Sequence, residues 1–272
     1  MKHLLVVALS LPLAACVVEV DDGPGDGSGS GSGSGSNAAG EVSGSITENA
    51  TWTGTVTVKG PTTIESGVVI TVAAGSTLAF NGSNSLTIKG TLDVQGTSTA
   101  KVNIQPSTGM YFGGITNSGT LKLNYAVQKG GGIYTQSGSS TFITDTQLSA
   151  VQGDFLVMSG GDLTMTYSQV GIPNDSTHCE LHFSSAGNVS ITHTNIVGAD
   201  YGFMFYGGAN GTYTNNNWFG NGIHIDATSG ASGDFTGSWF ENLRQGGATP
   251  NVTGLPTLTN APAKLTDAGV RP

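Results

Sequence analysis

The densest group of potential metal ligands in this 272-residue chain is His178-Cys179-Glu180-Leu181-His182, with His193 further along. Imidazole and thiolate groups bind transition metals, and a cysteine beside a histidine can act as a nucleophile. The surrounding pattern puts one histidine in a turn and the other on a strand, and no third group that could orient a Cys–His pair is evident. We predict a turn histidine, a small buried cysteine and a surface histidine, with no metal, cofactor or catalytic site. Metal binding by His178, Cys179 and His182 is the alternative.

Acidic residues are more numerous than basic ones, 18 against 9, but they are scattered. Glycosidases need a pair of carboxylates, and proton abstraction needs a base near one bond. Alignment on the repeat described below places Asp145 with Tyr167, His193, Asn217 and Trp239, while Asp226 and Glu241 fall in other columns. No two acids share a column. We therefore interpret these residues as solvated turn carboxylates and predict that the chain is not an enzyme.

Cys16 is the second residue with chemical potential, because of what precedes it. Lys2 and His3 are followed by an apolar run from Leu4 to Leu11 and then by Leu13-Ala14-Ala15-Cys16. A positive start, a short apolar run and small residues before a cleavage site are typical of a secretory signal peptide. The run is shorter than the roughly 20 residues that span a bilayer.

The Leu-Ala-Ala-Cys ending resembles the lipobox of bacterial lipoproteins. This resemblance implies cleavage before Cys16, a diacylglyceryl thioether on its sulfur and an acylated new N-terminus. Two or more acyl chains hold a protein firmly on a membrane. In Gram-negative lipoproteins an Asp after the cysteine commonly signals inner-membrane retention, and this position is Val17, which favours the outer membrane of the bacterial cell envelope. Residues 1–15 are then the signal peptide.

Residues 16–39 read as a tether. Gly27 to Ser36 is five uninterrupted Gly-Ser pairs, which cannot form a core and behave as a flexible coil.

Beyond the tether, an acidic balance disfavours nucleic acid as a partner. Only two cysteines are present, so with Cys16 lipidated no intramolecular disulfide framework can form.

The rest of the chain shows strand patterns almost everywhere. Segments such as Gly54-Thr-Val-Thr-Val-Lys-Gly60 are short, β-branched and alternate with period two, and Gly, Asn, Ser or Pro separates them. An internal repeat organises them: Gly161-Asp-Leu-Thr-Met-Thr-Tyr-Ser-Gln-Val170 returns as Gly187-Asn-Val-Ser-Ile-Thr-His-Thr-Asn-Ile196. A second column has the same spacing, near 22 residues, and contains Ile133, Phe155, Leu181, Phe203 and Ile223. We predict that these five side chains form one inward stack.

This pattern resembles the right-handed parallel β-helix, the architecture of the pectate-lyase-like superfamily. We expect an all-β solenoid over residues 40–246 and an extended tail or cap over 247–272; a β-sandwich or small propeller is the alternative. Aromatic residues crowd the last third, and we expect Phe203, Phe205, Phe219 and Phe235 to fill the core.

The expected function is that of a cell-envelope lipoprotein, attached to the membrane through Cys16, that presents a non-catalytic β-helix for structural, adhesive, glycan-binding or protein-binding roles. Enzymes of the resembled superfamily are mostly polysaccharide lyases and glycosidases. A carbohydrate-active enzyme with an unrecognised site is therefore the alternative.

Overall fold

The computed structural model describes residues 40–174, 177–206, 209–227, 232–242, 252–253 and 261–272. These residues form β-strands joined by turns and short connections, without any helix. Within these ranges nothing helical is long and apolar enough to cross a bilayer. Cys16 and the predicted signal peptide and tether lie outside the described residues.

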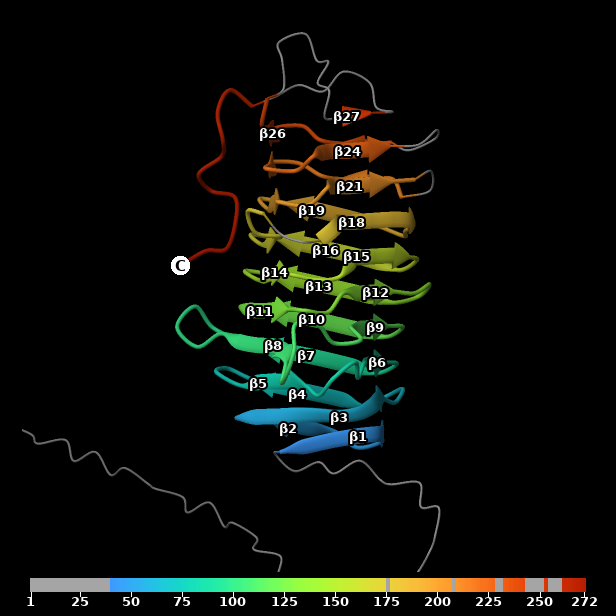
Figure 1. The fold of residues 1–272 in the computed structure, drawn as a ribbon. Coiled ribbons are helices and arrows are strands. Elements are labelled where there is room, and N and C mark those ends of the chain that lie inside the picture. The colour runs from blue at the N-terminus through green and yellow to red at the C-terminus, as the bar shows by residue number, and fades with distance from the viewer. Residues whose placement is uncertain (1–39, 175–176, 207–208, 228–231, 243–251, 254–260) are drawn as a thin grey trace, which may run out of the picture. The chain divides into compact units, whose positions relative to one another are not determined.

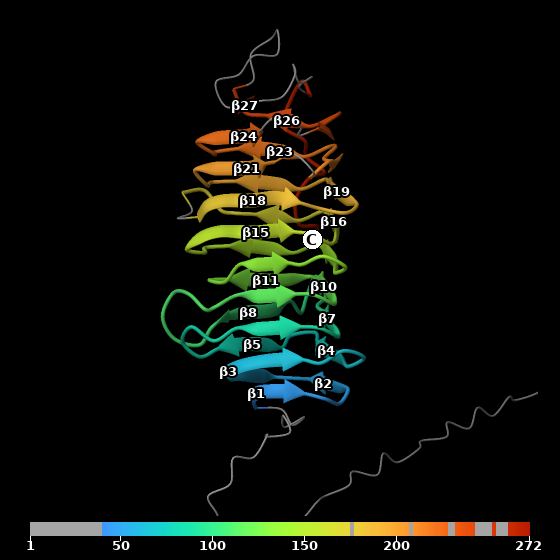
Figure 2. The same cartoon turned by 90° about the vertical axis from the view of Figure 1, so that its right-hand side faces the viewer.

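The strands stack into three parallel ladders, shown in two orientations in Figures 1 and 2. The first ladder contains β2 (Ala50–Trp52), β4 (Val69–Ala73), β7 (Thr91–Gln95), β10 (Thr120–Asn124), β13 (Ser140–Thr144), β16 (Asp162–Thr166), β19 (Val189–Thr192), β22 (Gly211–Thr212) and β25 (Gly233–Asp234). The second contains β5 (Thr77–Phe80), β8 (Val102–Pro106), β11 (Ala126–Lys129), β14 (Gln147–Ser149), β17 (Gln169–Val170), β20 (Asn195–Val197), β23 (Asn217–Phe219) and β26 (Trp239–Phe240).

The third ladder contains β6 (Leu86–Ile88), β9 (Ile115–Asn117), β12 (Ile133–Thr135), β15 (Gly153–Ser159), β18 (Thr177–Ser185), β21 (Tyr201–Phe205), β24 (Ile223–Ala227) and β27 (Val252–Thr253). The long strand β3 (Thr55–Ile64) joins the second and third ladders, and β1 (Glu41–Ile46) pairs with it. One strand from each ladder makes one coil, and about nine coils stack in chain order. The predicted all-β parallel β-helix is confirmed.

The register of the third ladder corrects the predicted inward stack. The continuous buried column is Leu86, Ile115, Ile133, Leu156, Leu181, Phe203 and Ile225. Ile133, Leu181 and Phe203 were assigned correctly, whereas Phe155 and Ile223 were not. Ile133 pairs with Leu156, and Leu156 pairs with Leu181, so each of these two gaps differs by one residue from the gap expected with Phe155 in the column. Phe155 is also buried, and its apolar character therefore could not reveal that Leu156 continues the column.

The corner between the first and second ladders uses left-handed backbone in successive coils. Tyr125, Asp145, Tyr167, His193 and Asn215 have φ values between 45° and 56°. The alignment of Asp145 with Tyr167 and His193 was thus correct. Its continuation was wrong by two residues, because Asn217 pairs with Asn195 on the second ladder and Trp239 pairs with Asn217 there.

A buried column of polar side chains follows this corner and contains Thr146, Ser168, Thr194, Asn216 and Ser238. The backbone N–H of Thr146 donates to Ser168 Oγ at 3.2 Å, and that of Thr194 donates to Asn216 Oδ1 at 2.8 Å. Each side chain thus serves a backbone group of the preceding coil. A buried N–H without a partner costs free energy, so this column is what allows the chain to turn here.

Candidate functional site

A partly exposed group of polar and aromatic side chains lies on β15, β18 and β21 of the third ladder and on the residue that follows β21. We call it the histidine–tyrosine face and define it as Asp154, His178, His182, Tyr201 and Tyr206. The Asp154 carboxylate contacts both histidines, with His178 Nδ1 at 2.8 Å from Oδ1 and His182 Nδ1 at 2.5 Å from Oδ2. The side chains of His178, His182 and Asp154 are 49%, 26% and 23% exposed, so solvent and ligands can reach them.

The shared carboxylate determines which ring nitrogens face a ligand. An ionised carboxylate only accepts hydrogen bonds, so both imidazoles donate from Nδ1–H. In a neutral imidazole the other nitrogen, Nε2, is then an acceptor. His178 and His182 therefore present two acceptors, and each changes into a donor when its ring is protonated. This arrangement suits a ligand rich in hydroxyl groups, since a hydroxyl can both donate and accept.

Two tyrosines border the histidines. The ring centroids of His178 and Tyr201 are 5.2 Å apart, and those of His182 and Tyr206 are 5.3 Å apart. Desolvation raises the pKa of the Tyr206 hydroxyl, and the carboxylates of Asp226 and Asp154 add to the rise. Tyr206 therefore stays neutral to a higher pH than an ordinary tyrosine, and it offers a hydroxyl beside a flat apolar ring, the combination that makes tyrosine frequent at binding surfaces.

Cys179 does not join this group. Its side chain is buried, and the thiol sulfur lies 3.0 Å from the carbonyl oxygen of Leu181. Burial raises the pKa of the Cys179 thiol well above its ordinary value, which disfavours the thiolate that a metal site or a nucleophile needs. Across the parts of the chain that the structure describes, no group of three or more His, Cys, Asp or Glu side chains could hold a metal ion.

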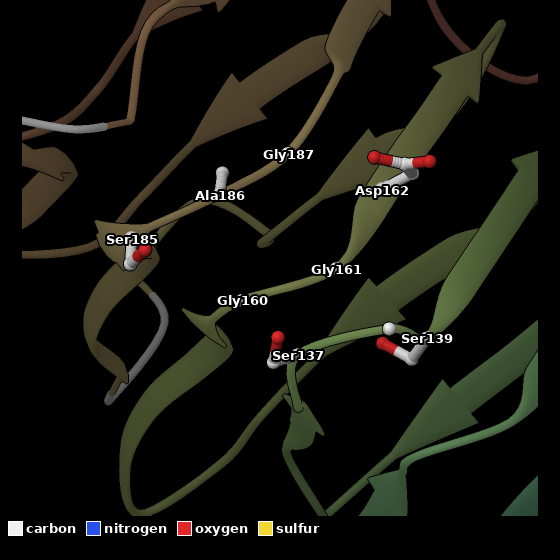
Figure 3. Close-up of a pocket in the computed structure, with 9 residues that line it drawn as sticks. Ser137, Ser139, Gly160, Gly161, Asp162, Ser185, Ala186 and Gly187 are labelled. Atoms are coloured by element: carbon white, nitrogen blue, oxygen red, sulfur yellow. The ribbon is translucent and has the colours of Figure 1, made fainter.

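A small polar pocket lies where strands β12, β15 and β18 of the same ladder lead into the first ladder (Figure 3). Its volume is about 260 Å³, and its walls come from three successive turns: Ser137, Gly138, Ser139, Gly160, Gly161, Asp162, Ser185, Ala186 and Gly187. The Asp162 carboxylate is oriented by the backbone N–H of Asn188, which donates to Oδ1 at 2.7 Å. The pocket is thus lined by hydroxyl and carboxylate groups.

Two glycines keep the middle turn of this pocket close to its neighbour. Gly160 and Gly161 have φ values of 154° and 84°, which side chains disfavour. A Cβ atom at Gly160 would lie 2.7 Å from the backbone of Ser137, and one at Gly161 would lie 2.3 Å from Ser139 Oγ. A larger residue at either position would displace the adjacent turn and deform the pocket.

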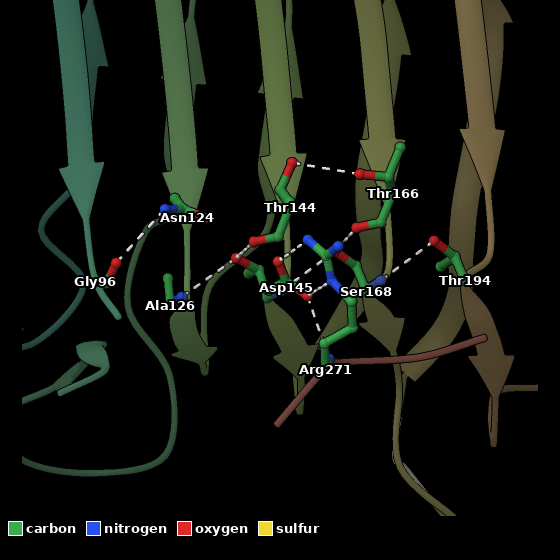
Figure 4. A network of polar contacts seen from close by, with 10 residues as sticks. Gly96, Asn124, Ala126, Thr144, Asp145, Thr166, Ser168, Thr194 and Arg271 are labelled. Carbon is green, nitrogen blue, oxygen red and sulfur yellow. Dashed lines mark hydrogen bonds and ion pairs between the residues drawn. The ribbon is translucent and has the colours of Figure 1, made fainter. Parts of the chain in front are cut away.

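The three acids singled out from the sequence have different environments. The prediction that Asp145 is a solvated turn carboxylate was wrong. Its side chain is only 1% exposed, and Arg271 binds it (Figure 4). The carboxylate of Glu241 accepts a hydrogen bond from the backbone N–H of Gly220 at 2.7 Å. Asp226 is partly exposed and stands in the third-ladder column of His182 and Met204.

Sequence reasoning did not find Asp154 or the contribution of Arg271. Asp154 is separated from His178 by a whole coil, and only the pairing of β15 with β18 brings them together. The aromatic prediction was mostly correct, since Phe203, Phe205 and Phe235 are buried. Phe219 was wrongly assigned to the core: it is partly exposed, and the Lys264 ammonium lies over its ring.

Comparison of this chain with protein-family models, with curated proteins and with solved structures gives no match.

Proposed function

We propose that this chain is a bacterial cell-envelope lipoprotein, anchored in a membrane through Cys16, whose β-helix binds glycans without cleaving them. The Leu13-Ala14-Ala15-Cys16 pattern and the Gly-Ser tether support the anchor, and Val17 favours the outer membrane. In this proposal the solenoid also serves as a rigid structural support that holds its binding surface away from the lipid.

The observation that carries the binding role is the histidine–tyrosine face. Asp154 orients His178 and His182 so that both direct Nε2 away from the carboxylate, and Tyr201 and Tyr206 place rings beside them. Ring faces stack against the apolar faces of sugars, while Nε2 atoms and phenol groups bond to hydroxyls. The serine- and glycine-lined pocket adds a polar recess at the end of the same strands.

The spacing of carboxylates supports binding rather than glycoside hydrolysis on this face. On strands β15, β18, β21 and β24 of the third ladder, the partly exposed acids are Asp154 and Asp226, whereas Glu180 is buried. Three strand spacings separate β15 from β24, which amounts to about 14 Å between backbones. Glycosidases hold their two carboxyl groups about 5 Å apart when retaining and about 6.5–9.5 Å apart when inverting.

The test is a binding and cleavage screen with the purified residues 40–272 and, in parallel, the full lipidated chain. A panel of pectins, alginates and glycosaminoglycans should include at least one polymer that binds, with neither new reducing ends nor unsaturated products, with or without calcium. Replacing His182 or Tyr206 by Ala should weaken that binding about tenfold, equivalent to ~1.4 kcal/mol.

Phe142 offers a matched control because its ring is 44% exposed on the first ladder, away from this face. The variant Phe142→Ala should bind like the unmodified protein. Equal losses in Phe142→Ala and Tyr206→Ala would show that any exposed ring contributes, and the assignment of the face would then be wrong. Reproducible cleavage that disappears on mutating a single Asp or Glu would instead establish the alternative, a carbohydrate-active enzyme.

A further inference from the structure

The C-terminal segment, residues 261–272, runs back along the side of the solenoid from the level of β26 toward that of β14 (Figure 1). Backbone N–H groups attach it at successive coils. Ala261 donates to the carbonyl of Ser238 at 2.9 Å, and Gly269 donates to the carbonyl of His193 at 2.8 Å. Between them, Leu265 donates to Asn217 Oδ1 at 2.9 Å, and Asn217 Nδ2 donates back to the Leu265 carbonyl at 2.9 Å.

The segment ends in a specific charge contact (Figure 4). Arg271 donates to the buried Asp145 carboxylate from Nε at 2.8 Å and from Nη2 at 2.6 Å, and its backbone N–H reaches Oδ1 at 3.2 Å. The guanidinium carbon also lies 4.0 Å from the centroid of the Tyr167 ring, which stacks on His193. Two parallel bonds to one carboxylate match the planar fork of Arg and not the single point charge of Lys.

A second cation of the segment makes an equivalent contact further along. Lys264 Nζ lies 3.2 Å above the centroid of the Phe219 ring. Cations over aromatic faces are attracted by the ring quadrupole. The side of the solenoid therefore provides one carboxylate, two aromatic rings and one side-chain amide, and the segment supplies a matching guanidinium, ammonium and backbone amide.

These contacts are those of a bound peptide and not of a structural strand. No residue in 261–272 belongs to a strand, and most of its side chains, including Pro262, Lys264, Thr266 and Arg271, are exposed. Little apolar surface holds the segment in place, so its attachment depends on a few polar and cation–ring contacts. Competing ligands can replace contacts of this kind, and salt weakens the exposed contacts more than the pair with the buried Asp145 carboxylate.

We propose that Asp145, Tyr167, His193, Asn217 and Phe219 form a peptide-binding strip for a segment that carries a guanidinium, and that residues 261–272 fill it as a displaceable intramolecular ligand. The partner that fits is an unstructured peptide with an Arg for Asp145 and a cation seven residues before it, as Lys264 and Arg271 are spaced here. This strip is separate from the histidine–tyrosine face, and the inference does not depend on glycan binding.

The test uses full-length protein and a synthetic fluorescent peptide with the sequence of residues 261–272. In the unmodified protein the strip is occupied at an effective concentration in the millimolar range, so added peptide should bind poorly. The variant Arg271→Ala weakens the internal ligand, and it should bind the peptide at least about tenfold more tightly by fluorescence anisotropy. The double variant Asp145→Asn with Arg271→Ala should lose this binding, as should a peptide that lacks the Arg.

A second measurement needs no variant. The amide protons of Leu265 and Gly269 should exchange with solvent much faster than those of the strand β19, because only the segment has to detach, and excess peptide should accelerate them further. The proposal is wrong if Arg271→Ala folds, as judged by its circular dichroism melt, yet does not bind the peptide. It is equally wrong if Asp145→Asn leaves binding intact or if the segment's amides exchange as slowly as those of β19.

Discussion

At the scale of single residues, Asp154 determines the chemistry of the histidine–tyrosine face, because one carboxylate accepts hydrogen bonds from two imidazoles. We predict that in their neutral forms both His178 and His182 carry their proton on Nδ1. Replacement of Asp154 by Ala should release the rings to the mixture of tautomers found in free imidazole. Nitrogen chemical shifts of the two rings measure this directly, and unchanged shifts in Asp154→Ala would contradict the assignment.

His224 is a buried titratable group that makes the stability of the fold depend on pH. Its Nε2 lies 2.9 Å from the carbonyl oxygen of Glu241, and burial lowers the pKa of the imidazole below its ordinary value. Below about pH 6.5 the unfolded chain binds a proton that the folded chain does not, so stability falls as the pH decreases from there toward the folded-state pKa. The lost free energy of unfolding is at most ~1.4 kcal/mol per pH unit.

We therefore expect His224→Gln to flatten the dependence of the urea midpoint on pH between about pH 6.5 and pH 5. The reference for this comparison is Phe142→Ala, which alters an exposed side chain that does not titrate and should keep the pH dependence of the unmodified protein. A His224→Gln profile that is as steep as that of the unmodified protein would show that another group causes the loss.

At the scale of strands, the third ladder has an outward column directly beside the buried column of Leu156 and Phe203. Leu156 and Phe203 are buried, whereas Met204 in the outward column is partly exposed. Leu156→Ala should cost about 2–5 kcal/mol and Phe203→Ala about 3–5 kcal/mol, because each leaves a cavity. Met204→Ala should cost much less. Denaturant melts provide the comparison, and similar losses for Leu156→Ala and Met204→Ala would mean that the register of the ladder is wrong.

The polar column at the corner provides a separate test of the same strands. Ser168 Oγ accepts from the backbone N–H of Thr146, and both residues are buried. Ser168→Ala removes the acceptor and should destabilise the fold by about 1–3 kcal/mol, since the N–H keeps no equivalent partner. Ser168→Thr retains a hydroxyl, as the equivalent residues Thr146 and Thr194 already do, and should be tolerated. If both variants melt alike, the hydroxyl has no such role.

The sequence predicted the solenoid, because repetition at about 22 residues with period-two strands permits few other arrangements. The register was less accessible. An error of one residue placed Phe155 where Leu156 belongs, and a slip of two residues moved Asn217 into the corner column. The two charge contacts, Asp154 with His178 and Asp145 with Arg271, join residues 24 and 126 positions apart, and only the folded chain shows them.

At the scale of the whole molecule, the proposed anchor makes a simple prediction. Cys16→Ser removes the sulfur that would carry the diacylglyceryl group, and the protein should move from the membrane fraction to the soluble fraction. Since one acyl chain binds only marginally and two bind firmly, the change should be nearly complete. Membrane fractionation, together with mass spectrometry of the mature N-terminus, checks this prediction. An N-terminus without lipid in the protein that keeps Cys16 would refute lipidation.

The C-terminal segment also has a mechanical consequence. Inter-strand hydrogen bonds of a parallel β-helix run along the stacking direction, so a pull on β1 along that direction would load one coil interface at a time and detach coils successively. Residues 261–272 connect the coil of Ser238 to that of Asp145 through side contacts, and tension between those coils is shared with the segment. We expect a stretched molecule to yield first in the coils from β1 to β12, which lie beyond the reach of the segment, and to extend further only after Arg271 has left Asp145.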